Sequence, residues 1–229
     1  MKATIYSHKT IIGTTDLEVG DESMGCVFGQ FIPNENYFND IQKFVWEFWT
    51  TNKPDYNKWY SLRFNAQLDN GFFLFPYGGY TFDDSPDFPE EPKRIDIAGI
   101  NIDILNFKSD SLLEPWDTID IERKIYFENE LIREITPPNS LIGFLGLNKK
   151  KNHILLGAET SAFAKYGPND DVLFQVNKKG NINQFATVHL TYAKNENVQP
   201  DFYPATHFFI DFNDFIEKRM KPDNIEWKS

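Results

Sequence analysis

The sequence predicts an α+β protein made of two modules of mostly antiparallel sheet, each with one or two packing helices. Strand-like runs alternate apolar and polar residues and are separated by turn residues, which is typical of hairpins. Two other segments repeat apolar residues at helical spacing. The chain has 229 residues, enough for two small domains. We place their boundary between residues 110 and 111.

The first module is predicted to begin with strands and to continue into a helix. Residues 2–33 alternate β-branched and aromatic residues between glycine-containing turns, which predicts two or three strands. Residues 34–51 carry an apolar stripe at about 100° per residue, as amphipathic helices do. The stripe consists of Tyr37, Phe38, Ile41, Phe44, Val45, Phe48 and Trp49. Trp46 lies off this stripe, so it either meets a second layer or is exposed.

Three further segments complete the first module. Asp69-Asn70-Gly71 stands between two aromatic-rich runs and predicts a hairpin. Residues 83–92 contain five acids and three prolines, so we expect a loop there. Residues 94–107 alternate isoleucine with polar residues, which predicts a strand pair that turns at Gly99.

The second module is predicted to begin with a helix over residues 119–135, which the prolines after Thr136 end. Its apolar face holds Ile121, Ile125, Ile132 and Ile135. Strand-like runs follow at 141–147, 153–158, 171–177 and 183–193. A short terminal helix is expected after Asp211.

The register of the hairpin within residues 169–193 follows from its apolar residues. They occupy alternate positions in both strands, at Val172, Phe174 and Val176 and at Ala186, Val188 and Leu190. Pairing the two sets closes the hairpin around residues 179–181, because a one-residue slip would turn one set outward. The same pairing places Asp171 opposite His189 and Leu173 opposite Thr187.

A carboxylate–imidazole pair of this kind has two interpretations. Asp171 and His189, with Asp170 beside them, are candidate catalytic residues for acid–base chemistry. The alternative is a structural pair that stabilises the hairpin by up to about 1 kcal/mol. We favour the structural pair and assign no catalytic residue, because a general base also needs a nucleophile or a cleft.

The sequence motifs give no reason to expect a cofactor or a metal. His8, His153, His189 and His207 are scattered, without zinc-ligand spacing. Phosphate-binding loops, dinucleotide fingerprints and nucleophile elbows are not found. Cys26 is the only cysteine, and we expect a buried thiol in a reducing cytoplasm.

The net charge of −11 is unevenly distributed. Residues 1–92 contain six Lys/Arg and 14 Asp/Glu, a balance of −8, and the other 137 residues contain 17 and 20, a balance of −3. A nucleic-acid partner is therefore not expected, because phosphate backbones are bound by clustered Lys and Arg. A basic protein would be attracted instead. No uncharged apolar run approaches the ~18 residues that span a bilayer, so we expect no membrane partner and a cytoplasmic location.

Two acidic segments are the expected contacts for such a partner, and Trp46 is a candidate aromatic anchor. The acids are Asp16, Glu18, Asp21 and Glu22 in the first segment, and Asp83, Asp84, Asp87, Glu90 and Glu91 in the second.

Residues 120–220 resemble an uncharacterised bacterial protein family. The family pattern joins a helix with EL-x-RE, a strand with DDVLF and a strand with AVVHLT. Here the corresponding segments are 130–134, 170–174 and 186–191, the last reading ATVHLT. Tyr192 stands where the family usually has Trp, and Pro138-Asn139-Ser140-Leu141 stands where it often has GH-x-L.

Residues 10–40 also resemble uncharacterised bacterial proteins, some of which are similar to immunity proteins paired with secreted toxins. Together the resemblances imply a bacterial cytoplasmic protein with two parts. Neither of them implies an enzymatic reaction.

We therefore expect a non-enzymatic binding protein, in particular an immunity or inhibitor protein that neutralises a basic toxin such as a nuclease. The first alternative is a small-ligand-binding or scaffold module, which an apolar pocket without clustered titratable groups would support. The second is a hydrolase-like enzyme that uses Asp170, Asp171 and His189, which a concave pocket around His189 would support. The oligomeric state stays open.

Overall fold

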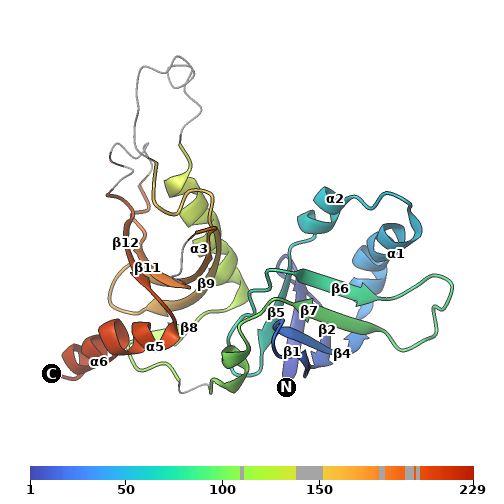
Figure 1. Cartoon of the computed structure of the whole chain (residues 1–229), viewed down its shortest axis with the longest axis horizontal. Helices are drawn as coiled ribbons and strands as arrows, with labels where there is room; N and C mark the ends of the chain where they lie inside the picture. The colour runs from blue at the N-terminus through green and yellow to red at the C-terminus, as the bar shows by residue number, and fades with distance from the viewer. Residues whose placement is uncertain (109–110, 138–151, 181–183, 194–198, 200–201) are drawn as a thin grey trace, which may run out of the picture. The chain divides into compact units, whose positions relative to one another are not determined.

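The computed structural model describes residues 1–108, 111–137, 152–180, 184–193, 199 and 202–229 (Figure 1). The chain is an α+β protein and forms two compact units, Met1–Ser109 and Asp110–Ser229. Within the described residues each unit holds one antiparallel sheet, of seven strands in the N-terminal unit and five in the C-terminal unit. No described helix is both long enough and apolar enough to cross a membrane.

The N-terminal sheet has the order β5-β1-β2-β4-β7-β6, and β3 also pairs with β4. Its strands are β1 (Lys2–Ser7), β2 (Thr10–Asp16), β3 (Glu18–Asp21), β4 (Cys26–Pro33), β5 (Phe64–Leu68), β6 (Gly79–Asp83) and β7 (Arg94–Ala98). Residues 2–33 therefore form four strands, where two or three were predicted. β4 pairs with β2 and β3 along one edge and with β7 along the other, so it joins the two halves of the sheet.

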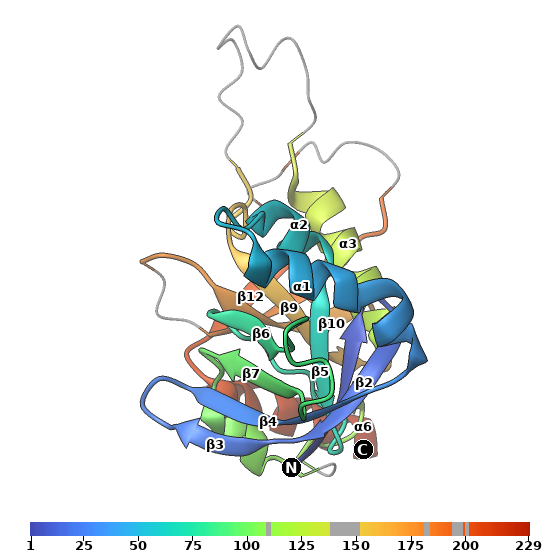
Figure 2. The same cartoon turned by 90° about the vertical axis from the view of Figure 1, so that its right-hand side faces the viewer.

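The helix predicted over residues 34–51 is confirmed as a π-helical turn, η1 (Tyr37–Ile41), that continues into α1 (Gln42–Thr50). A second helix, α2 (Tyr56–Ser61), begins where the Asp55 side chain accepts the backbone N–H of Lys58 at 3.0 Å. Both helices lie on the same side of the sheet (Figures 1 and 2).

Aromatic side chains fill the space between these helices and the sheet. The ring centroid of Phe31 on β4 lies 5.0 Å from that of Tyr37 and 5.1 Å from that of Phe82 on β6. Trp59 of α2 joins the cluster 6.3 Å from Phe82. Pairs of this geometry contribute about 0.5–1.5 kcal/mol beyond the area that they bury. Phe31 and Phe82 therefore help to hold the helices on the sheet.

The predicted hairpin at Asp69-Asn70-Gly71 forms only in part. The chain turns there, but the following run makes a single isolated bridge, between Gln67 and Phe73. β5 takes its full ladder from β1 instead, with Ala3 opposite Leu68. The pairing partner of β5 thus comes from the start of the chain rather than from the neighbouring run.

The predicted strand pair around Gly99 is wrong in its second half. β7 forms as expected, but residues 102–106 form a 3-10 helix, η2 (Ile102–Asn106). The Asn101 side chain accepts the backbone N–H of Asp103 at 3.0 Å and so caps a helical turn. This local cap outweighs the alternation of isoleucine, which suggested a strand.

The C-terminal sheet has the order β12-β11-β10-β9-β8. Its strands are β8 (Trp116–Thr118), β9 (Glu159–Tyr166), β10 (Asp171–Asn177), β11 (Phe185–His189) and β12 (Ala205–Phe209). The prediction for 171–177 is confirmed, and the run 183–193 forms a strand over 185–189. The predicted strand at 153–158 is wrong, since turns occupy it. The predicted strand at 141–147 lies outside the described residues.

Helices cover the C-terminal sheet. The predicted second helix is confirmed as α3 (Ile121–Ile135), which the Asp120 side chain caps. The end of the chain is more helical than predicted and comprises α5 (Phe212–Phe215), the π-helical turn η3 (Ile216–Met220) and α6 (Lys221–Lys228). Phe185 and Phe209 are cross-strand partners and so share a sheet face. Their rings pack against Phe212 and Phe215, which docks the terminal helices on that face.

Candidate functional site

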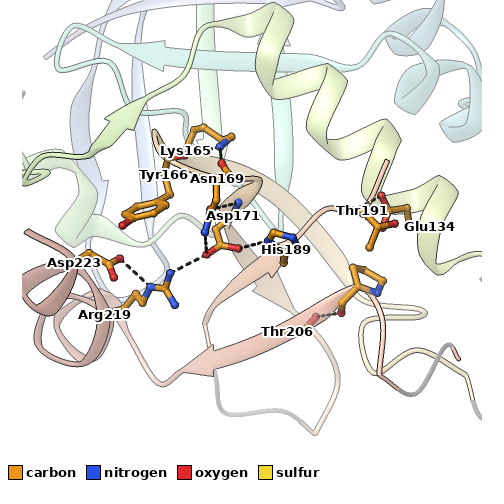
Figure 3. Close-up of polar contacts among 11 residues, drawn as sticks. Glu134, Lys165, Tyr166, Asn169, Asp171, His189, Thr191, Thr206, Arg219 and Asp223 are labelled. Carbon is orange, nitrogen blue, oxygen red and sulfur yellow. Dashed lines mark hydrogen bonds and ion pairs between the residues drawn. The ribbon is translucent and has the colours of Figure 1, made fainter. Parts of the chain in front are cut away.

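The predicted pairing of Asp171 with His189 is confirmed, as is that of Leu173 with Thr187. The imidazole Nδ1 of His189 lies 2.8 Å from Asp171 Oδ1 (Figure 3). A carboxylate without a proton can only accept, so Nδ1 is the donor in this contact. The loop predicted around residues 179–181 lies partly outside the described residues.

The second oxygen of Asp171 faces away from the histidine and binds the C-terminal helical segment. Arg219 of η3 places Nη2 2.8 Å from Asp171 Oδ2. The Asn169 side-chain amide donates to the same oxygen at 3.1 Å, and its own oxygen accepts the Asp171 N–H at 2.8 Å. Asp171 is therefore shared between an imidazole and a guanidinium.

The contacts continue from Arg219 to a second carboxylate. Arg219 Nε lies 2.8 Å from Asp223 Oδ2, and the Trp116 indole N–H donates to that oxygen at 2.8 Å. We call the chain His189–Asp171–Arg219–Asp223–Trp116 the polar network. It joins three strands to η3 and α6. Figure 3 shows its part from His189 to Asp223. The Asp171 and Asp223 side chains are 12% and 11% exposed, whereas that of His189 is 47% exposed.

This geometry suits a structural clamp better than a catalytic pair. A carboxylate that orients a histidine can support a general base, but here Arg219 already neutralises Asp171. The hydroxyl of Thr191, two residues along the chain from His189, donates to Glu134 Oε2 at 2.9 Å and so is already engaged. The Asp170 side chain is exposed, and its backbone carbonyl accepts the N–H of Leu190 at 3.1 Å.

The end of α3 holds the segment that follows β11. The Glu134 carboxylate accepts the backbone N–H of Thr191 at 2.8 Å and that of Tyr192 at 2.7 Å. Burial raises the pKa of Glu134, and the hydrogen bonds from Thr191 and Tyr192 oppose that rise. Tyr192 has a positive φ of 50°, and Arg133 Nη1 donates to the Ala193 carbonyl at 2.5 Å. These contacts fix a strained turn onto the helix.

The segments 130–134, 170–174 and 186–191 meet in this region. Glu134 comes from the EL-x-RE segment, Asp171 from DDVLF, and His189 and Thr191 from ATVHLT. Asp171 contacts His189, and Glu134 contacts Thr191. Sequence reasoning missed Arg219, which is 48 residues from Asp171 and has no motif around it.

The acids predicted to bind a partner are mostly exposed but do not form one surface. The exposed ones are Asp16, Glu18, Asp21, Glu22, Asp83, Asp87, Glu90 and Glu91. In the β4–β7 ladder Gln30 pairs with Arg94 at one end, beside the loop of residues 84–93. At the other end Ile100 donates its N–H to Gly25, in the β3–β4 turn. Asp21 and Glu22 therefore lie at the opposite end of this ladder from the acidic loop, whereas Glu18 pairs with Phe28 alongside it. The β3–β4 turn and the β6–β7 loop are separate in Figure 2.

Asp84 and Trp46 are not surface contacts, contrary to expectation. Asp84 is only 4% exposed, and its carboxylate lies 3.3 Å from Lys93 Nζ. It also accepts hydrogen bonds from Tyr37 at 2.8 Å, Gln42 at 3.0 Å and the half-buried Trp46 at 3.0 Å. Burial and the neighbouring Asp84 raise the pKa of Tyr37 well above its usual range. Trp46 thus meets a polar layer beneath the helix.

This buried cluster closes the base of the acidic loop. Asp84 and Lys93 stand at its two ends, and Lys93 Nζ also donates to the Pro89 carbonyl within the loop at 3.0 Å. Beyond this base the loop extends past the sheet, between β6 and β7 (Figure 1).

Exposed aromatic side chains surround the acidic loop. Phe88 at its tip is 61% exposed, and Phe38 and Trp49 are each 49% exposed. The Lys93 ammonium lies 6.0 Å from the Phe38 ring, and the Trp49 indole donates to the Phe82 carbonyl at 2.8 Å, so both rings lie near the loop. We call this surface the loop face, consisting of Phe38, Trp49, Asp83, Asp87, Phe88, Glu90 and Glu91. Phe38 and Phe88 were missed, because a phenylalanine in sequence is more often core.

Among the described residues, no group of three or more His, Cys, Asp or Glu side chains is arranged to hold a metal. Cys26 is half-buried rather than buried.

No protein-family model matches the sequence, and neither a curated protein nor a solved structure is detectably similar to it. Function is therefore inferred from the chain's own residues.

Proposed function

We propose that the protein is a non-enzymatic binding protein whose N-terminal unit binds a basic protein partner through the loop face. One observation carries the proposal. Three exposed aromatic side chains, those of Phe38, Trp49 and Phe88, lie among exposed carboxylates. Aromatic anchors supply most of the energy in many protein interfaces, and surrounding charges select the partner and speed encounter.

The charges of the loop face favour a cationic partner. None of Asp87, Glu90 and Glu91 lies within 4.0 Å of a basic group in the described part of the chain. The Lys93 ammonium is turned inward to Asp84 and does not offset them at the surface. The unpaired carboxylates add to the balance of −8 in residues 1–92.

The buried base of the loop supports the same proposal. Association costs free energy when mobile segments become ordered, and a segment already held in place costs less. The Asp84 carboxylate has four polar partners, so the ends of the loop are held before any partner arrives. The loop is thus suited to presenting Phe88 in one orientation.

In its particular form the proposal is an immunity or inhibitor protein that covers the cationic active site of a toxin, such as a nuclease, in the bacterial cytoplasm. The acidic balance and the resemblance of residues 10–40 support this form. An enzyme that uses Asp170, Asp171 and His189 is less favoured, because Arg219 already engages Asp171.

Two variants with equal charge changes test the proposal. The loop variant carries Asp87→Asn, Glu90→Gln and Glu91→Gln, and the control carries Glu18→Gln, Asp21→Asn and Glu22→Gln in β3 and the turn after it. The wild-type chain captures its partner from a native bacterial extract at low salt, and calorimetry then measures the affinity of each variant for the purified partner. We expect about tenfold or greater loss in the loop variant and little in the control.

Three outcomes would contradict the proposal. Equal losses in both variants would show attraction by net charge without a defined surface. A captured partner that is acidic, or one retained unchanged at high salt, would exclude an electrostatic role for the loop face.

A further inference from the structure

A pocket of about 520 Å³ opens between α1 and α2 in the N-terminal unit. Its apolar lining comes from Phe44, Phe48, Trp59 and Leu62. The rings of Phe48 and Trp59 lie 4.4 Å apart between centroids, tilted by 33°. Pockets that hold small molecules have volumes of roughly 300–1,000 Å³ and are mostly apolar, with few polar groups. The volume lies in that range, and the four apolar side chains form one wall for a flat organic molecule, whereas the other six lining residues are polar or charged.

The polar rim of the pocket has one cation without a counterion. Lys58 Nζ lies 2.6 Å from Glu47, which neutralises it. The Asp55 side chain is committed to capping α2. Lys53 also lines the pocket, is exposed, and has no carboxylate within 4.0 Å among the described residues. Lys53 is therefore the rim cation that is available to pair with a carboxylate, although the Asp55 carboxylate keeps its own charge while it caps α2.

The wider surroundings of the pocket have the same sign. Lys43 lies beside it, with its ammonium 4.9 Å from the Phe44 ring, and Lys58 lies 4.6 Å from that ring. With Lys53, these are three of the six Lys/Arg residues in positions 1–92. The three lysines stand against the two carboxylates of Glu47 and Asp55, and the remaining excess of one positive charge favours an anion over a cation.

We propose that this pocket binds a two-ring aromatic monocarboxylate. The rings lie against Phe48 and Trp59, and the carboxylate pairs with Lys53. The site does not depend on the loop face, and its charge preference is opposite to that of the proposed protein partner. The experiment on this pocket can therefore succeed or fail independently of the experiment on the loop face.

Three probes of one shape and different charge test the site: 2-naphthoate, 2-naphthamide and 2-naphthylmethylamine. Each is titrated into the full chain by calorimetry, and NMR follows the indole N–H of Trp59. We expect 2-naphthoate to bind at one site, shift the Trp59 signal, and bind about tenfold more tightly than the amine. Lys53→Gln should remove the preference for the anion, whereas Lys9→Gln, a control outside the pocket lining, should retain it.

The Lys53 side chain is exposed, so its substitution should leave the melting temperature unchanged and the comparison valid. Phe44→Ala provides a second variant and should weaken all three probes. Failure of 2-naphthoate to bind the wild type, or binding that leaves the Trp59 signal in place, would overturn the site. Equal affinity for the three probes would overturn its proposed preference for a carboxylate.

Discussion

His189 and Arg219 share one carboxylate, each lying 2.8 Å from a different oxygen of Asp171. The two contacts differ in their surroundings. The His189 side chain is 47% exposed, whereas Arg219 is 30% exposed and also contacts the well-buried Asp223. Water screens the first contact more than the second. Most of the stabilisation from the polar network should therefore come from the contacts of Arg219 with Asp171 and Asp223.

Substitution within the polar network separates these two contributions. We expect Asp171→Asn to lower the free energy of unfolding by about 2–3 kcal/mol, because Arg219 is left beside a neutral amide. His189→Gln removes only the exposed contact and should cost less than about 1 kcal/mol. Urea denaturation of the full chain measures both changes.

Asp117→Asn is the matched control for charge, since Asp117 is exposed on the neighbouring β8. It should change stability by less than about 0.5 kcal/mol. If His189→Gln were as destabilising as Asp171→Asn, the imidazole rather than the arginine would hold the network together.

Sequence reasoning found the Asp171–His189 pair because register follows from alternation. The apolar positions of β10 and β11 allow one pairing that keeps both sets on one face, and the opposed polar residues follow from it. Arg219 could not be found in this way. Its place depends on how η3 docks, and that docking is set by rings such as Phe212 and Phe215, far along the chain from β10.

Two errors have causes that composition hides, one local and one tertiary. Residues 153–158 contain the apolar run Ile154-Leu155-Leu156, yet the Leu155 N–H donates to His153 Nδ1 and the chain turns. Asp84 lies in a run of acids that resembles a solvated loop. Its burial depends on donors from Tyr37 and Trp46, which reach it only after the helix has packed on the sheet.

The buried ion pair of Asp84 and Lys93 in the N-terminal unit should contribute more to stability than the polar network does. Asp84→Asn leaves Lys93 buried without an anion, and we expect a loss of about 3–5 kcal/mol in the free energy of unfolding. Lys93→Met leaves the Asp84 carboxylate with its three neutral donors and should cost less. The double variant should be more stable than additivity predicts, and a double-mutant cycle by urea denaturation measures this coupling.

An additive double-mutant cycle would argue against direct coupling between Asp84 and Lys93.

The Lys93→Met variant also bears on the binding of the partner. Because the pair closes the base of the acidic loop, Lys93→Met should weaken the partner affinity through loss of preorganisation although it removes no carboxylate. An unchanged affinity in that variant would show that the loop keeps its shape without the pair.

The contact between Glu134 and the turn after β11 should be visible in hydrogen exchange. A glutamine has one acceptor oxygen where the carboxylate has two, so Glu134→Gln should lose part of the bonding to Thr191 and Tyr192. We expect a loss of about 1–2 kcal/mol in stability and faster exchange of these two amides. Glu122→Gln, at an exposed position on the same helix, should change neither.

His153 should make the stability of the protein depend on pH. Its ring is 4% exposed, Nδ1 accepts the Leu155 N–H at 3.1 Å, and Nε2 lies 3.0 Å from the Pro204 carbonyl, so the neutral ring is the bound form. Burial lowers the pKa of His153 below its ordinary value of 6.5. Between the two pKa values the unfolded chain binds more protons than the folded one. The stability that the neutral ring contributes is therefore complete above about pH 6.5 and declines as the pH falls below it.

Thermal unfolding at several pH values between about 7 and about 5 measures this decline. We expect the wild type to lose stability over this range, and His153→Gln to be less stable at pH 7 but flatter in its pH dependence. His207→Gln is the control, because His207 is exposed and should leave the slope of the wild type intact. If His153→Gln kept the full pH dependence of the wild type, a group other than His153 would be taking up the protons on unfolding. The prediction rests on His153 because the fold accommodates its buried ring in the neutral form and excludes the charged form.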